Sequence, residues 1–354
     1  MSDPAAAFDE LIARFREEKK YAQLFEARLM KRRWELGLPL LTQSAIPDET
    51  VMSAAREAGE LFLADGQIAR AWPYFRALGE PGPVREAIER TPVDAGDESV
   101  IDVALSEQVH PARGFRMLLA HHGICRAITL FDQYPHQPTR LECLELLVRT
   151  IHEDLVANLK RSLEKVEGAA PETNAIPELL RDWMFGAYDY YVDVSHLGSI
   201  VRYSAEASDP EVLRLAVELT EYGRRLSAEL QYRGDPPFED LYTDHAAWFK
   251  ALLGQEVEEC IAHFQGKVAS YDYEQIGTYP AQVLVRMLVR LGRYSQAVAT
   301  YETWCKDADP MYLHCPPFEQ LCIMAQDWDR IKASARRDGD ALRYLAAELS
   351  QCAT

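Results

Sequence analysis

Several features that mark large classes of protein are missing from this sequence. Its seven cysteines are an odd number and include no Cys-x-x-Cys pair, so we expect neither a disulfide framework nor a zinc ribbon. No apolar run reaches the roughly 18 residues that a membrane-spanning helix needs. The opening residues, MSDPAAAFDELIARF, lack the basic and apolar segments of a secretory signal. These absences predict a cytoplasmic protein with buried, free thiols.

Positive charge is also scarce. The 354 residues include 38 lysines and arginines against 56 acidic residues, which gives a formal net charge of −18. Nucleic acids and anionic membranes bind basic surfaces, so we expect neither as a partner. The basic run Lys31-Arg32-Arg33 falls near the end of a helical pattern, where the helix dipole favours cations. Arginine outnumbers lysine and alanine is abundant, which is typical of a GC-rich bacterial genome.

Alternating, β-branched segments are nearly absent, and helical periodicity dominates instead. One apolar stripe runs through Phe8, Leu11, Ile12 and Phe15, and similar stripes occur near residues 141–159 and 212–226. Proline and glycine interrupt these patterns, for example in LGEPGPV and GAAPETNAIPE, and such residues end helices and form turns. The sequence therefore predicts an all-α fold.

An internal repeat gives the helices an order. The segment ADGQIARAWPYF (64–75) resembles AHHGICRAITLF (120–131), with Ala71 and Phe75 opposite Ala127 and Phe131. Related segments cover residues 251–264, 288–304 and 324–335, and their turns near residues 254, 292 and 326 lie 38 and 34 residues apart. This period is typical of stacked helical hairpins. A small alanine in the second helix allows close approach, and an aromatic residue one turn later fills the groove.

The segment TYPAQVLVRMLVRLGRYSQAVATYETWCKDADP (278–310) resembles the tetratricopeptide-repeat family. Gly292, Tyr294, Ala297, Val298 and Tyr301 match its turn and second helix, and Asp309-Pro310 matches its exit. The match is partial for 61–78 and 117–134 and weak for 245–268 and 314–337, and the family's first-helix tryptophan and glycine are absent. The resemblance implies an α-solenoid, a right-handed superhelix with a concave groove, but it does not specify a ligand.

We therefore expect a single α-helical array over residues 1–354. Its predicted parts are an N-terminal cap helix (1–47), helical hairpins (48–134), long, irregular helices (135–240) and C-terminal hairpins of the tetratricopeptide type (241–354).

Two adjacent histidines, His121 and His122, are the first candidate site residues. The repeat alignment places them opposite Asp65 and Gly66, at the bend of a hairpin. They are interpreted as exposed turn residues in preference to an active-site edge.

A second candidate lies in DYYVDVSHLGSIVRYS (189–204). If this segment is helical, Asp189, Asp193 and His196 share one stripe. Two carboxylates and an imidazole on one face can bind a divalent metal or perform acid–base chemistry. The alternative is a solvated polar face, or a carboxylate–histidine pair that joins two helices.

A third candidate is the loop RGDPPFEDLYTDHAAWF (233–249), which contains Asp244 and His245. A proline-stiffened acidic loop can close over a groove. The alternative is a plain connector in which Asp244 caps the following helix.

The sequence has no glycine-rich phosphate loop, no Gly-x-Ser-x-Gly and no His-Glu-x-x-His motif. The preferred hypothesis is a scaffold that binds a protein or peptide, of basic or mixed charge, in a concave groove. The alternative is an all-α enzyme or ligand-binding protein with a carboxylate–histidine site around Asp189, Asp193 and His196. No cofactor is predicted for the scaffold, whereas a divalent metal is possible under the alternative.

Overall fold

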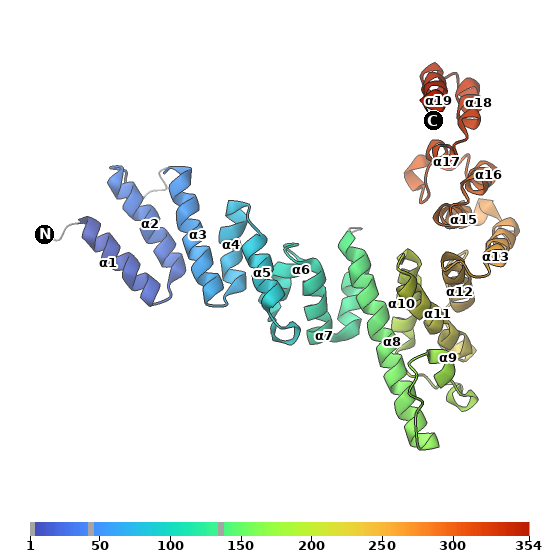
Figure 1. The fold of residues 1–354 in the computed structure, drawn as a ribbon, viewed down its shortest axis with the longest axis horizontal. Helices are drawn as coiled ribbons and strands as arrows, with labels where there is room; N and C mark the ends of the chain where they lie inside the picture. The colour runs from blue at the N-terminus through green and yellow to red at the C-terminus, as the bar shows by residue number, and fades with distance from the viewer. Residues whose placement is uncertain (1–3, 42–45, 134–137, 354) are drawn as a thin grey trace. The chain divides into compact units, whose positions relative to one another are not determined.

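The structure is a computed structural model that describes residues 4–41, 46–133 and 138–353. Within these residues the chain forms nineteen α-helices and no β-strand (Figure 1), which confirms the all-α prediction. No helix in the described ranges is both long and apolar enough to cross a membrane. The chain divides into two compact units, Met1–Cys143 and Leu144–Thr354.

The first unit consists of helices that pack mainly against their neighbours in the sequence. They are α1 (Pro4–Glu17), α2 (Tyr21–Glu35), α3 (Asp48–Ala64), α4 (Ile68–Leu78), α5 (Gly82–Arg90), α6 (Glu98–Leu105) and α7 (Pro111–Gln133), with a 3-10 turn, η1 (Val93–Ala95), before α6.

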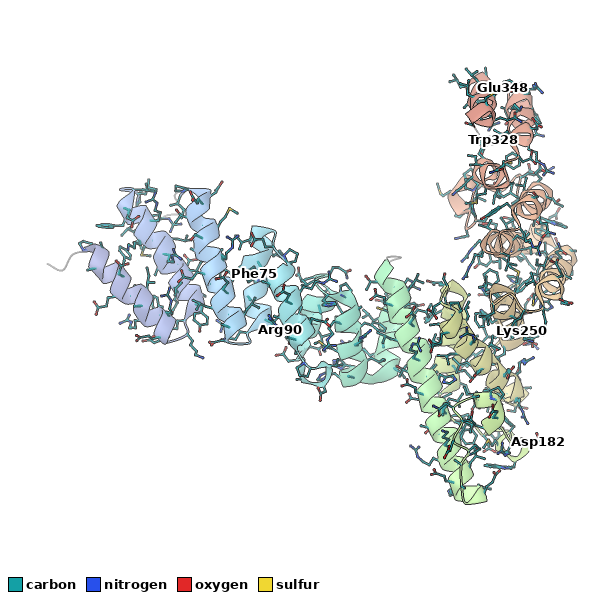
Figure 2. The ribbon with its side chains drawn as sticks, viewed as in Figure 1. Phe75, Arg90, Asp182, Lys250, Trp328 and Glu348 are labelled. Atoms are coloured by element: carbon teal, nitrogen blue, oxygen red, sulfur yellow. The ribbon has the colours of Figure 1, made fainter. Side chains whose placement is uncertain are left out.

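The hairpin of α3 and α4 shows how the repeat pattern folds. Gly66 adopts a positive φ of 73° in the turn, where a side chain would be strained. Ala71 of α4 is fully buried, and a Cβ atom added to Gly59 of α3 would lie 2.8 Å from the Phe75 ring. Phe75 lies in the core of this unit (Figure 2). The small residues and the aromatic ring therefore have the roles predicted for them.

The N-terminal segment differs from its prediction. Residues 1–47 were expected to form one cap helix, but the described part contains two helices, α1 and α2, that pack against each other. The chain reverses at Lys19, whose φ is +56°. The apolar stripe continues across this break because Tyr21 and Leu24 are buried by the packing of α2. Periodicity alone did not reveal the turn.

The second unit begins within α8 (Pro138–Glu167) and continues to the end of the chain. Its other helices are α9 (Ile176–Leu179), α10 (Val194–Tyr203), α11 (Pro210–Arg225), α12 (Leu241–Leu252), α13 (Val257–Ser270), α14 (Tyr273–Ile276), α15 (Tyr279–Arg290), α16 (Tyr294–Trp304), α17 (Phe318–Ala325), α18 (Trp328–Asp338) and α19 (Ala341–Ala353). The 3-10 turns are η2 (Asp182–Met184), η3 (Ser204–Glu206), η4 (Ala228–Leu230) and η5 (Pro310–Tyr312).

The long helices expected over residues 135–240 are only partly found. Helix α8 has 30 residues and α11 has 16, but α9, α10 and the 3-10 turns of this region are short. Residues 135–137 lie outside the described residues. Helix α8 packs on α11, where His152 Nε2 lies 2.8 Å from Glu218 Oε2. Proline and glycine in the segments between α8 and α11 keep α9 and α10 short.

The C-terminal hairpins form where the repeat predicts them. Helices α15 and α16 flank Gly292, and α12 and α13 flank Gly254. In α16, Ala297 and Val298 are fully buried and Tyr301 is nearly so. These local hairpins are therefore confirmed, whereas a continuous superhelical array over the whole chain stays a prediction.

All seven cysteines are free thiols. The prediction of buried thiols holds for five of them and is wrong for Cys125 and Cys352, which are exposed.

Candidate functional site

The paired histidines lie at a bend, as predicted. Helix α7 is interrupted at Gly123, whose φ of 74° and ψ of 178° are not helical. His121 and His122 directly precede this break and are both exposed. His122 Nε2 lies 2.7 Å from Glu98 Oε2, on the N-terminal turn of α6. This contact supports a surface role that joins two helices.

The shared helical face predicted for Asp189, Asp193 and His196 is wrong. Helix α10 begins only at Val194, so Asp189 lies in the preceding turn, where its Oδ2 accepts a hydrogen bond from the Gly186 amide at 3.2 Å. Asp193 is the N-cap, and its Oδ1 accepts from the amides of Ser195 (2.8 Å) and His196 (3.1 Å). An aspartate at this position satisfies amides that have no partner inside the helix.

The hydrogen bonds of Asp193 also affect its ionisation. The Ser195 hydroxyl and the helix amides hold the pKa of this carboxyl below its usual value, despite partial burial. In the part of the chain that the structure describes, no group of three or more His, Cys, Asp or Glu residues is arranged to hold a metal ion. The geometry thus gives no support to the metal site that was the alternative hypothesis.

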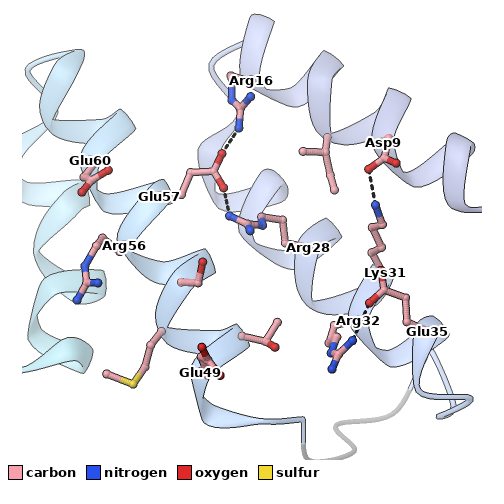
Figure 3. Close-up of a pocket in the computed structure, with 14 residues that line it drawn as sticks. Asp9, Arg16, Arg28, Lys31, Arg32, Glu35, Glu49, Arg56, Glu57 and Glu60 are labelled. Atoms are coloured by element: carbon pink, nitrogen blue, oxygen red, sulfur yellow. Dashed lines mark hydrogen bonds and ion pairs between the residues drawn. The ribbon is translucent and has the colours of Figure 1, made fainter.

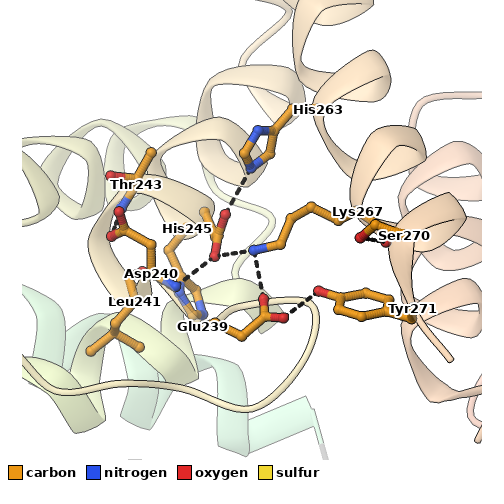
Figure 4. Close-up of polar contacts among 10 residues, drawn as sticks. Glu239, Asp240, Leu241, Thr243, His245, His263, Lys267, Ser270 and Tyr271 are labelled. Carbon is orange, nitrogen blue, oxygen red and sulfur yellow. Dashed lines mark hydrogen bonds and ion pairs between the residues drawn. The ribbon is translucent and has the colours of Figure 1, made fainter. Parts of the chain in front are cut away.

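Asp244 is the buried member of a polar network with His263, Lys267, Glu239 and Tyr271 (Figure 4). Its side chain is only 1% exposed, although the residue occurs in the first turn of α12. Its Oδ1 lies 2.7 Å from His263 Nε2, and its Oδ2 lies 2.6 Å from Lys267 Nζ; both partners come from α13. The expected helix cap is instead Asp240, whose Oδ1 accepts from the Thr243 amide at 3.1 Å. Asp244 thus joins two helices.

The same lysine binds a second carboxylate. Lys267 Nζ lies 2.6 Å from Glu239 Oε2, and the Tyr271 hydroxyl donates to Glu239 Oε1 at 2.5 Å. Burial opposes ionisation of Glu239, but these two hydrogen bonds outweigh it and hold its pKa below the usual value. Burial and the adjacent carboxylate raise the pKa of Tyr271. The network therefore fixes the loop before α12 onto α13.

His245, the next residue, has a different environment. It is 2% exposed, stacks on Phe238 with ring centroids 4.2 Å apart, and its Nδ1 lies 2.7 Å from the Leu241 carbonyl oxygen. Burial lowers its pKa to about 4. The imidazole is therefore neutral near pH 7, with Nδ1 as donor and Nε2 as acceptor.

The first unit contains a groove of about 990 Å³ between α1, α2 and α3 (Figure 3). Five cations and five carboxylates line it: Arg16, Arg28, Lys31, Arg32 and Arg56, and Asp9, Glu35, Glu49, Glu57 and Glu60. Its lining is therefore balanced in charge, unlike the strongly acidic chain as a whole.

Every cation of the groove already has a partner. Glu57 binds both Arg16 and Arg28, Lys31 binds Asp9, Arg32 binds Glu35, and Arg56 binds Glu80. Two carboxylates differ: Glu49 and Glu60, both exposed on α3, have no hydrogen bond or ion pair within residues 4–41, 46–133 and 138–353. The charges still available to a partner in this groove are therefore negative.

Reasoning from the sequence missed the partners of Asp244 and the entire groove. His263, Lys267 and Tyr271 are spaced i, i+4 and i+8, a polar stripe on one helical face that was a usable signal. The sequence contains no comparable signal for the groove, because the residues that line it come from three helices and each helix displays ordinary surface charges.

No protein-family model, curated protein or solved structure matches this chain significantly.

Proposed function

We propose that this protein is a helical-hairpin scaffold, similar to tetratricopeptide-repeat proteins, that binds a basic or mixed-charge peptide segment in the groove of α1, α2 and α3. The supporting observation is the charge state of that groove: its cations are all paired, whereas Glu49 and Glu60 are not. A partner that supplies lysine or arginine would form ion pairs with these two carboxylates. The free thiols fit the reducing cytoplasm, where we expect the protein to act.

The dimensions of the groove favour a peptide over a small metabolite. A volume of about 990 Å³ is at the upper end of the roughly 300–1,000 Å³ range of small-molecule pockets. Its lining also lacks the aromatic walls that such pockets usually have, and Met52, 45% exposed, is its most accessible large apolar side chain. Exposed ion pairs each contribute only about 0.2–1 kcal/mol, so we expect modest affinity that weakens with salt.

The test uses the full-length protein and three fluorescent peptide libraries of equal length, enriched in Lys and Arg, in Asp and Glu, or in neutral residues. We expect the basic library to raise fluorescence anisotropy at the lowest protein concentration. The double variant Glu49→Gln with Glu60→Gln is expected to weaken that binding roughly five-fold, which corresponds to about 1 kcal/mol.

A matched control is the double variant Glu86→Gln with Asp94→Asn. Both of these side chains are exposed in the first unit, lie outside the groove and lack a partner among the described residues. An equal loss in this control would indicate a general effect of net charge and would contradict the groove as the binding site. Equal binding of all three libraries would contradict the proposal as well.

A further inference from the structure

A second cavity, of about 430 Å³, lies within the second unit. It is bounded by the end of α10 with η3, by the loop 234–238, by α12 and by α15. This volume falls within the range of about 300–1,000 Å³ in which proteins bind small molecules. None of the peptide-groove residues takes part in it.

One face of α12, one face of α15 and the loop 234–238 form the apolar walls of the cavity. Leu241, His245 and Trp248 follow one another at i, i+4 and i+7 on α12. Phe238 of the loop stacks on His245 and lies 5.9 Å from Trp248, edge to face. Trp248 and His245 are only 1% and 2% exposed, so the partly exposed ring of Phe238, which they support from behind, is the surface left for another aromatic ring.

Side-chain hydrogen bonds to two backbone carbonyls hold Trp248 and η3, which both border the cavity. Trp248 Nε1 donates to the Ala205 carbonyl oxygen at 3.3 Å, and Arg290 donates to the same oxygen at 2.6 Å. Arg290 also donates to the Ala207 carbonyl oxygen. Because these groups are fixed before any ligand arrives, binding loses little of its free energy to ordering the site.

The charge network around Asp244 holds the C-terminal end of the loop 234–238 in place. Gly234 and Phe238 line the cavity, while Glu239 binds Lys267 and the Asp240 amide donates to Asp244 Oδ2 at 2.9 Å. A Cβ atom added to Gly234 would lie 2.2 Å from the Phe238 carbonyl oxygen, so the loop is too tight there for any side chain.

The charges of the cavity are balanced. Arg202 and Arg286 contribute two cations, and Glu206 and Asp235 contribute two carboxylates. The side chains of Arg286 and Asp235 have no hydrogen bond or ion pair in the part of the chain that is described. His245 adds no charge, because burial lowers its pKa to about 4. A ligand that satisfies both unpaired groups needs an anionic and a cationic group.

We infer that this cavity binds a free aromatic α-amino acid. Its ring would pack on Phe238, its carboxylate would pair with Arg286, and its ammonium group would pair with Asp235. A guanidinium can bind a carboxylate through two parallel hydrogen bonds, which adds orientation to charge attraction. This inference concerns a different site from the peptide groove and does not depend on the proposed function.

The test is isothermal titration calorimetry on the full-length protein with three probes. L-phenylalanine carries both charges, N-acetyl-L-phenylalanine only the carboxylate, and L-phenylalanine amide only the ammonium group. We expect saturable binding of L-phenylalanine and affinities at least ten-fold weaker for both derivatives. Equal or tighter binding of either derivative would overturn the inference, since one charge would then suffice, and absence of saturable binding by L-phenylalanine would also overturn it.

Two variants test which cavity residue binds the carboxylate and which binds the ammonium group of the ligand. Arg286→Met is expected to weaken the binding of L-phenylalanine about ten-fold without changing the affinity of L-phenylalanine amide. Asp235→Asn should also weaken the binding of L-phenylalanine about ten-fold, but it should leave the affinity of N-acetyl-L-phenylalanine unchanged. The controls Arg214→Met and Asp154→Asn alter exposed residues of the same unit whose side chains have no hydrogen bond or ion pair within the described residues. If the controls weaken binding as much as the cavity variants, the site is elsewhere and the inference fails.

Discussion

Asp244 and His245 are adjacent in the sequence, yet they differ in environment and charge. Successive residues on an α-helix point about 100° apart, so Asp244 faces His263 and Lys267 of α13 while His245 faces Phe238 and the cavity. The carboxylate is surrounded by donors, including Lys267 and the Asp240 amide. The imidazole is enclosed by apolar groups, which disfavour its protonated form.

This environment predicts an acid sensitivity that belongs to His245. Its pKa is about 4 in the folded protein and about 6.5 when exposed, so the unfolded chain binds the proton more tightly. The associated stability is complete above pH 6.5 and is lost as the pH falls towards 4, by about 3 kcal/mol. His245→Phe keeps the stack on Phe238 but cannot titrate. We therefore expect urea unfolding to show a smaller loss of stability between pH 7 and 4.5 in this variant than in the wild type. An identical loss in both proteins would show that His245 is not protonated on unfolding in this range.

At the scale of elements, the glycines that end or interrupt helices adopt two different backbone conformations. Gly79 ends α4 in the left-handed helical region, with φ 70° and ψ 22°. Gly123 instead interrupts α7 at φ 74° and ψ 178°, a region that is essentially restricted to glycine. Neither glycine has other atoms within 4 Å of an added Cβ, so any cost of substitution there comes from the backbone and not from crowding.

We therefore expect Gly123→Ala to destabilise the protein more than Gly79→Ala. The expected losses in free energy of unfolding are about 1–3 kcal/mol for Gly123→Ala and about 1 kcal/mol for Gly79→Ala. Chemical denaturation followed by circular dichroism measures both. A smaller effect at Gly123 would mean that α7 is continuous in solution and that His121 and His122 do not lie at a bend.

At the scale of the whole molecule, each unit has its own buried residues and its own candidate site. The peptide groove lies in Met1–Cys143, and the amino-acid cavity and charge network lie in Leu144–Thr354. Proteins built from two compact units often unfold in more than one step. Substitutions in one unit should then leave the other largely unaffected.

The charge network provides a test of this independence. Lys267→Met removes the cation that pairs with the buried Asp244 and the partly exposed Glu239. Asp244 keeps its contacts with His263 and the Asp240 amide, so we expect a cost of about 1–3 kcal/mol. We expect two unfolding transitions in urea, of which Lys267→Met lowers one and Gly123→Ala the other. Lys250→Met, which removes a more exposed ion pair with Glu256, should change stability by less than about 1 kcal/mol. A single transition that shifts equally in both test variants would show that the units unfold together.

The sequence by itself determined the all-α class and the positions of the hairpins. Helical period, proline and glycine are local properties, and each repeat contains its own turn, small residue and aromatic residue, as in Ala71 with Phe75 and Ala297 with Tyr301. It failed where a turn left the periodicity intact, at Lys19, and where a cap took the place of a helical face, at Asp193.

Only the tertiary structure decided the sites. Asp244 and His245 were identified from the sequence as candidates, but their partners are contributed by α13 and by the preceding loop. The groove and the cavity each combine residues from three or more elements, and whether Glu49, Asp235 or Arg286 has a partner depends on how those elements pack. Burial and ion pairing are properties of contacts between distant residues, and a period along the chain contains no information about them.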